Sequence, residues 1–200
     1  MPHTLLDAPG YERFPGYDEG HRVSGWKDTD WFCRSNDFIA SARAQVDYGT
    51  NFSDLKQVGT RLLFDLPLFR TSLDGSWTNY YEDLPIGGSD HLALGDANLV
   101  WRFVQHPRTQ WRSGVGINWL TGGEDELGFN FTYGFDVLPV HPLVWSNELD
   151  LGTVGHATLL RLRTTFGAQW RSGELYTGVE YVDIDHAHLP AMLFGFRYWW

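Results

Sequence analysis

The chain has little lysine, one cysteine and no long apolar run. Lysine and arginine together number 15, and only Lys27 and Lys56 are lysine. Cys33 stands alone, so no disulfide can form within the chain, and the redox compartment cannot be inferred from it. No stretch of 18 consecutive apolar residues occurs, which excludes a transmembrane helix. The formal net charge of −10 argues against nucleic acid as a partner.

The N-terminus also lacks the features of a signal peptide. It reads MPHTLL, with no basic segment and no long apolar segment after it. We therefore expect a mature chain whose signal peptide is absent. The mean hydropathy of −0.31 is typical of soluble proteins, yet aromatic residues make up 16% of the chain. A membrane barrel with a polar interior can have such a value, because only alternate residues face lipid.

What the chain does have is a strict alternation of apolar and polar residues. In the segment 129–136 every odd position is aromatic and every even position is small or polar. Successive side chains of a β-strand point to opposite faces, so such a segment has one apolar and one polar face. The pattern predicts an all-β, membrane-spanning, antiparallel up-and-down β-barrel of about ten strands. The expected strands are 38–49, 56–66, 69–80, 92–104, 110–120, 127–138, 143–153, 158–170, 175–183 and 191–200.

The rest of the chain divides into a short N-terminal segment and the connections between strands. Residues 1–37 are rich in proline, glycine and charge, and we expect a periplasmic arm or cap, or alternatively a plug in the lumen, followed by the barrel at 38–200. Connections at 50–55, 81–91, 121–126, 154–157 and 184–190 are expected to be longer or richer in acid and to be external, and those between them short and periplasmic. Both termini would then be periplasmic. The prolines that we place in connections are Pro67, Pro85, Pro107, Pro139, Pro142 and Pro190.

The charges decide which face is inside. In every expected strand they fall on the polar face, with arginine and carboxylate in equal number, as an enclosed ionic network requires. Arginine suits such a network because its planar guanidinium pairs carboxylates through two hydrogen bonds. Nine glycines on the same face, among them Gly59 and Gly195, leave room for long side chains. The expected lumenal network comprises Arg43, Asp47, Arg61, Asp65, Arg70, Asp74, Asp96, Arg102, Arg112, Asp136, Glu148, Asp150, Arg161, Arg163, Glu180 and Arg197.

The opposite face carries most of the tryptophan. Many of these side chains lie near expected strand ends, as in the aromatic girdles that anchor barrels at the two membrane interfaces. The alternative is a soluble barrel with an aromatic ligand pocket, but so many indoles would overfill a lumen. The expected interface aromatics are Trp77, Trp101, Trp111, Trp119, Trp145, Trp170, Tyr198 and Trp200.

The last residues carry a recognisable motif. Gly195 is followed three residues later by Tyr198 and then by the terminal aromatic Trp200. This resembles the C-terminal assembly signal of bacterial outer-membrane β-barrel proteins, in which the last residue is usually phenylalanine. No particular family within that class is indicated. The resemblance implies an outer-membrane location and recognition of this strand by the barrel-assembly machinery.

The external connections supply the candidates for chemistry. The segment 183–188 brings Asp183 and Asp185 close to His186 and His188, which are weak candidates for a metal site or a general base. This resembles the omptin surface proteases only in strand number and rim location, and no second acidic pair is evident. Acidic residues at Asp54, Glu82, Asp83, Asp90 and 124–126 make the rim negative. Such a rim serves solubility, or attracts cations and bridges divalent cations to lipopolysaccharide.

Taken together, these features predict a small integral outer-membrane barrel with a charge-filled lumen and a structural or surface-interaction role. One alternative is a narrow, weakly cation-selective channel, and another is an enzyme at the rim around Asp185 and His186. Ten strands lie between barrels filled by side chains and porins that hold water, nearer the filled kind. No cofactor and no catalytic residue is expected. The expected partners are membrane lipid, lipopolysaccharide and the assembly machinery.

Overall fold

The structure, a computed structural model, describes residues 42–66, 70–83, 88–106, 108–123, 125–185 and 187–199. The expected arm at 1–37 and the first residues of the expected strand 38–49 lie outside this part. The strands are β1 (Ala42–Thr50), β2 (Leu55–Asp65), β3 (Thr71–Asp83), β4 (Ser89–His106), β5 (Thr109–Thr121), β6 (Glu126–Val137), β7 (Leu143–Val154), β8 (Ala157–Trp170), β9 (Gly173–Ile184) and β10 (Ala187–Trp199).

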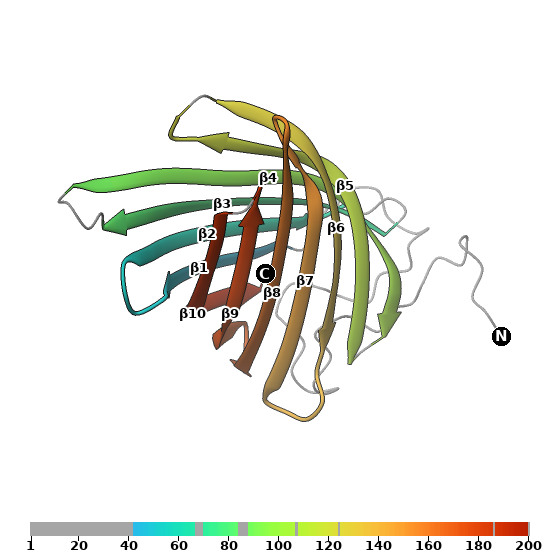
Figure 1. Cartoon of the computed structure of the whole chain (residues 1–200). Helices are drawn as coiled ribbons and strands as arrows, with labels where there is room; N and C mark the ends of the chain where they lie inside the picture. Colours follow the sequence, from blue (N-terminus) through green and yellow to red (C-terminus); the bar gives the residue numbers. More distant parts are fainter. Residues whose placement is uncertain are drawn as a thin grey trace.

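These strands form one closed antiparallel barrel (Figure 1). Each strand pairs with its neighbours in sequence, and β1 closes the sheet by pairing with β10 from Arg43 opposite Trp199 to Thr50 opposite Met192. The predicted fold, an up-and-down barrel of ten strands, is confirmed. Among the described residues there is no helix long and apolar enough to span a membrane.

The two faces of the sheet differ as the alternation predicts. In β6, Asn130 is 0% exposed and its neighbour Phe129 is 55% exposed. The same contrast runs along the other strands, with polar side chains enclosed and large apolar side chains facing outward. An apolar exterior around a polar interior is the architecture of transmembrane barrels. Outward apolar residues include Val46, Val58, Leu62, Leu99, Val115, Ile117, Leu162, Phe166, Phe194 and Phe196.

The two ends of the barrel differ in charge more than in loop length. We call the end that holds the β1–β2, β3–β4, β5–β6, β7–β8 and β9–β10 connections the acidic end, and the opposite one the basic end. The expected connection at 184–190 is too long, because β9 ends at Ile184 and β10 already begins at Ala187, whereas the one at 154–157 agrees to within a residue with β7 ending at Val154 and β8 beginning at Ala157. The inward apolar positions Val182 and Ile184 extend the alternation to the end of β9. There β9 is still paired with β10, with Ile184 opposite Ala187.

One expected connection proline is in a strand. Pro190 lies in β10 opposite Tyr181 of β9, whereas β1 pairs with β10 only as far as Met192. Proline cannot donate a ladder hydrogen bond and is tolerated where one side of a strand has no partner. Pro139 and Pro142 lie in the β6–β7 connection as expected. The remaining three predictions, Pro67, Pro85 and Pro107, lie outside the described residues.

A charge on the outward face tests the membrane-spanning fold. Val115 lies at the middle of β5 and is 51% exposed on the outward face. Val115→Arg should destabilise the barrel in a bilayer by about 2–4 kcal/mol, because the charge would sit at the membrane midplane. Leu127→Arg, near the acidic end of β6, should cost only about 0–1 kcal/mol. Denaturant unfolding from vesicles measures both, and equal effects would contradict a lipid-facing exterior.

Candidate functional site

The enclosed lumen holds most of the predicted ionic residues. Two of them differ from the rest. Asp65 is only partly buried at the basic end, and Arg70 lies in the β2–β3 connection, because β3 begins at Thr71 instead of residue 69. The buried members of the expected set are Arg43, Asp47, Arg61, Asp74, Asp96, Arg102, Arg112, Asp136, Glu148, Asp150, Arg161, Arg163, Glu180 and Arg197.

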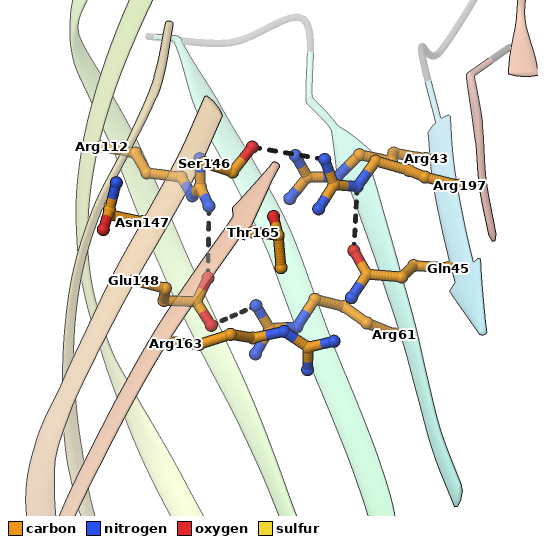
Figure 2. A pocket seen from close by; sticks show the side chains of 10 residues that line it. All are labelled: Arg43, Gln45, Arg61, Arg112, Ser146, Asn147, Glu148, Arg163, Thr165 and Arg197. Atoms are coloured by element: carbon orange, nitrogen blue, oxygen red, sulfur yellow. Dashed lines mark hydrogen bonds and ion pairs between the residues drawn. The ribbon is translucent and has the colours of Figure 1, made fainter. Parts of the chain in front are cut away.

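Glu148 of β7 is the centre of the first ionic cluster. Arg61 donates to its Oε1 from β2, and Arg112 Nη2 donates to its Oε2 from β5 at 3.2 Å (Figure 2). Arg112 also binds Asp136, which lies 3.6 Å from Arg43 Nη1 of β1. This cluster therefore joins strands from opposite sides of the barrel across its interior.

Arg161 of β8 is the centre of the second cluster. Its Nη2 donates to Asp96 Oδ2 of β4 at 2.5 Å, and its Nε donates to Asp150 Oδ2 of β7 at 2.7 Å. Asp96 Oδ1 also accepts a hydrogen bond of 2.7 Å from Asn98 Nδ2. Asn98 in turn accepts one of 2.9 Å from Asn130 of β6. An amide chain therefore extends this ionic cluster to β6.

Asp47 of β1 receives three donors in the third cluster. Arg163 Nη2 lies 2.5 Å from Asp47 Oδ2, Tyr176 Oη donates to the same oxygen at 3.0 Å, and Gln45 Nε2 donates at 3.3 Å. Tyr176 reaches this position across Gly195, where a Cβ atom would lie 2.3 Å from the tyrosine hydroxyl oxygen. The glycine of the C-terminal motif thus makes room for a tyrosine that binds the lumenal carboxylate.

Glu174 is a lumenal carboxylate that the sequence prediction missed. It was assigned to the β8–β9 connection, but β9 begins at Gly173 and places Glu174 inside, 1% exposed. Arg197 Nη1 donates to Glu174 Oε2 at 2.9 Å, and Arg197 Nε donates to Gln45 Oε1 at 2.9 Å. Extending the alternation of β9 by one residue toward its start would have found it.

The charges thus gather in clusters, and Gln45 links the third cluster to Arg197 and Glu174, because it donates to Asp47 and accepts from Arg197. A separate pair closes the basic end, where Arg102 Nη1 lies 2.9 Å from Asp65 Oδ2. Its carboxylate also accepts a hydrogen bond of 2.7 Å from Ser72. The sequence alone does not indicate which of these side chains meet, because the register of the strands, which alternation does not reveal, sets the partners.

An apolar cluster fills the lumen toward the acidic end, and it too was missed. Its members occupy inward positions on strands that carry charges further along, as Leu94 does on β4 beside Asp96. Partly buried side chains of Leu92, Leu120, Ile184 and Leu189 pack against it. The cluster consists of Leu55, Tyr80, Leu94, Val154, Leu159 and Val182.

The space left within the ionic part is small. A cavity of ≈ 10 Å³ lies among Arg43, Arg61, Arg112, Arg197 and Glu148 (Figure 2). A volume of about 10–15 Å³ on this measure holds one water molecule. The lumen among the described residues is therefore packed by side chains.

The rim at the acidic end holds the histidine candidate. Tyr181 Oη and His188 Nδ1 lie 2.9 Å apart, and Asp183 Oδ2 lies 3.4 Å from the same nitrogen. The described residues contain no group of three or more side chains placed to hold a metal ion. His186 lies outside them. His188 stands on the outward face of β10, 56% exposed, and is not enclosed with a carboxylate as a buried general base would be.

The β1–β2 connection at this rim is organised by one asparagine. Asn51 Oδ1 accepts hydrogen bonds from the amides of Ser53 and Leu55 at 2.9 and 3.0 Å. Asn51 Nδ2 donates to Asp54 at 2.8 Å, and this hydrogen bond lowers the pKa of the Asp54 carboxyl. The loop holds Phe52 at a φ of 62°, and the residue is 73% exposed.

The outward aromatics gather mainly at the basic end. A chain of ring contacts runs there from Trp101 through Phe103, Tyr133, Trp111, Phe135 and Trp145 to Phe166. Trp170 and Tyr198 face outward at the same end. Trp119 stands nearer the acidic end against Trp77, with ring centres 5.9 Å apart. Trp200 lies outside the described residues.

Comparison with known proteins yields a likeness in barrel architecture. No protein-family model and no curated protein matches the chain. The backbone structure of the Yersinia pestis outer membrane protein Ail in a phospholipid nanodisc is 9% identical, with a TM-score of 0.45 over 81% of this chain and 100% of that one. The crystal structure of Ail, the attachment invasion locus protein of Yersinia pestis, is 9% identical, with a TM-score of 0.38 over 80% and 96%.

Glu148 should be the most sensitive position of the lumen. Glu148→Gln removes the charge that Arg61 and Arg112 share and leaves two enclosed guanidinium groups under-compensated, at a cost of about 3–5 kcal/mol if the site is dry. Asp65→Asn is the matched control, because the Asp65 side chain is 18% exposed and that of Glu148 is 5%. Denaturant unfolding should give the control a much smaller effect. A neutral Glu148→Gln would indicate a hydrated lumen.

Proposed function

We propose that this chain is an integral outer-membrane β-barrel of a Gram-negative-type bacterium whose lumen does not conduct, so that it acts through its surface as a structural or interaction barrel. The observation that carries the proposal is the filling of the lumen. Arginine–carboxylate clusters occupy its middle and basic end, and the apolar cluster around Leu94 and Val182 occupies its acidic end.

The ionic clusters and the apolar cluster form two layers of the lumen, and they oppose ion conduction in different ways. An ion that crossed the ionic clusters would have to displace buried partners such as Arg161 and Asp96, which are 3% and 1% exposed. It would then meet apolar side chains that offer no ligand to a desolvated ion. The cavity of ≈ 10 Å³ among the arginines has room for about one water molecule and so supplies no continuous water path.

An outer-membrane location is supported by the even number of antiparallel strands, the apolar exterior and the C-terminal Gly195 and Tyr198 motif. A rim enzyme is not favoured, because the His188 side chain is 56% exposed and its contacts with Tyr181 and Asp183 do not enclose it as a buried general base would be enclosed.

Planar-bilayer recording tests the filled lumen. The purified full-length barrel should give no discrete conductance steps in neutral salt solution, because neither layer leaves a water path. Small, stable, cation-selective steps would support the channel alternative. Large porin-like steps would refute the proposal. Heat-modifiable migration on gels, measured on the same sample, verifies that the barrel is folded.

Labelling of whole cells tests the orientation. The acidic end should be external and the termini periplasmic, so in a Cys33→Ser background Ser53→Cys should react with a membrane-impermeant maleimide. Ser172→Cys, in the β8–β9 turn at the other end, should react only after the outer membrane is permeabilised. The reverse pattern of labelling would invert the proposed orientation.

A further inference from the structure

The small cavity in the ionic part of the lumen is lined mainly by cations. It has a volume of ≈ 10 Å³ and is lined by side chains from β1, β2, β5, β7, β8 and β10. Figure 2 shows Arg43 and Arg197 extending from one side of this space toward Arg112 on the other. Glu148 is the one carboxylate among the described residues that line it. The lining arginines are Arg43, Arg61, Arg112, Arg163 and Arg197.

Several donors in this lining have no acceptor within the described part of the protein. The Nε atoms of Arg43, Arg61 and Arg163 are buried without a hydrogen-bond partner there, and so is the hydroxyl oxygen of Thr165. These four residues are between 2% and 7% exposed. Buried donors in native proteins nearly always have a partner, so a group of them around one space indicates a bound water molecule or ion.

Arg43 shares its counter-charge with another arginine. Its Nη1 lies 3.6 Å from Asp136 Oδ2, beyond hydrogen-bonding distance, and the same oxygen accepts a hydrogen bond from Arg112. The guanidinium carbon of Arg43 also lies 5.1 Å from the centre of the Trp199 ring, which stabilises the cation but accepts no conventional hydrogen bond. A guanidinium group buried in this way requires a further acceptor.

The acceptors of the lining are already occupied. Arg61 and Arg112 each donate to one oxygen of Glu148, and Arg197 donates to Ser146 Oγ and to Gln45 Oε1. A water molecule in the cavity would need acceptors for its own hydrogens as well as donors for its oxygen. A halide ion only accepts, so it matches an excess of donors better than water does.

We infer that this cavity binds one chloride ion, held by arginine N–H groups, those of Arg43 first, and by the Thr165 hydroxyl. A chloride ion is only slightly larger than a water molecule, whereas phosphate and sulfate exceed a space of this volume. The carboxylates that pair with the arginines at other points, such as Asp47 and Glu174, do not line the cavity. The ion would be a permanent counter-charge inside the closed barrel.

Urea unfolding of the full chain in detergent micelles tests the site. Sodium chloride replaces sodium gluconate in steps at constant total salt, because gluconate is too large for the cavity. Once chloride exceeds its dissociation constant, each tenfold rise in chloride should lower the unfolding equilibrium constant of the wild type about tenfold, as expected for one ion bound to the folded state alone.

Arg43→Gln should abolish this chloride dependence, because it removes the cation that lacks an acceptor. Arg102→Gln is the matched control and should keep the dependence, since Arg102 is a buried arginine that pairs with Asp65 and does not line the cavity. Both variants are compared by the slope against chloride, so a general loss of stability does not affect the comparison.

A pair of uncharged variants decides the question if Arg43→Gln does not fold. Thr165→Val keeps the shape of the side chain and removes the hydroxyl donor, so the chloride concentration needed for stabilisation should rise about tenfold. Thr132→Val, at another buried lumenal threonine that does not line the cavity, should leave it unchanged.

Three results would each overturn the inference. They are a wild-type unfolding constant that does not depend on chloride, which would leave the cavity to water, an unaltered dependence in Arg43→Gln, and equal effects of Thr165→Val and Thr132→Val.

Discussion

Every backbone amide and carbonyl that faces hydrocarbon needs a partner within the protein, and the pairing of β1 with β10 meets that requirement by leaving the sheet no free edge along their shared register. Closure has a second effect, since it divides the side chains of every strand into an inside and an outside set. The alternate residues of each strand therefore meet two different environments, lipid on the outside and the packed side chains of the lumen on the inside.

The interior shows why arginine is used and lysine is nearly absent. A guanidinium group can bind two carboxylates at once, as Arg112 does with Asp136 and Glu148. A lysine ammonium would offer a point charge without the planar fork. Glycines such as Gly195 make room for the long inward side chains, here Tyr176. A lumen filled by long inward side chains therefore depends both on arginine as the cation and on glycines that leave space on the inner face.

The fold was predictable from sequence because alternation is a local signal. The segment around Phe129 and Asp136 indicates strand and face without knowledge of any partner. What could not be predicted depends on register. Arg43 was expected in the network, but nothing in the sequence selects Asp136 as its neighbour across the barrel. Leu94 and Asp96 both point into the lumen. Only their different positions along the barrel axis place Leu94 in the apolar cluster and Asp96 among the ionic residues.

The lumenal contacts join residues that are far apart in the chain. Arg163 and Asp47 are separated by 116 positions, and Gln57 and Glu180 by 123. Such pairs form only after nearly all strands have assembled, so the chain must insert with these charges still hydrated. Topologies dominated by distant contacts also fold slowly. Expulsion of lumenal water then accompanies closure as one cooperative event. No single hairpin can afterwards leave without exposing buried charge, which makes the finished barrel long-lived through a high barrier to unfolding.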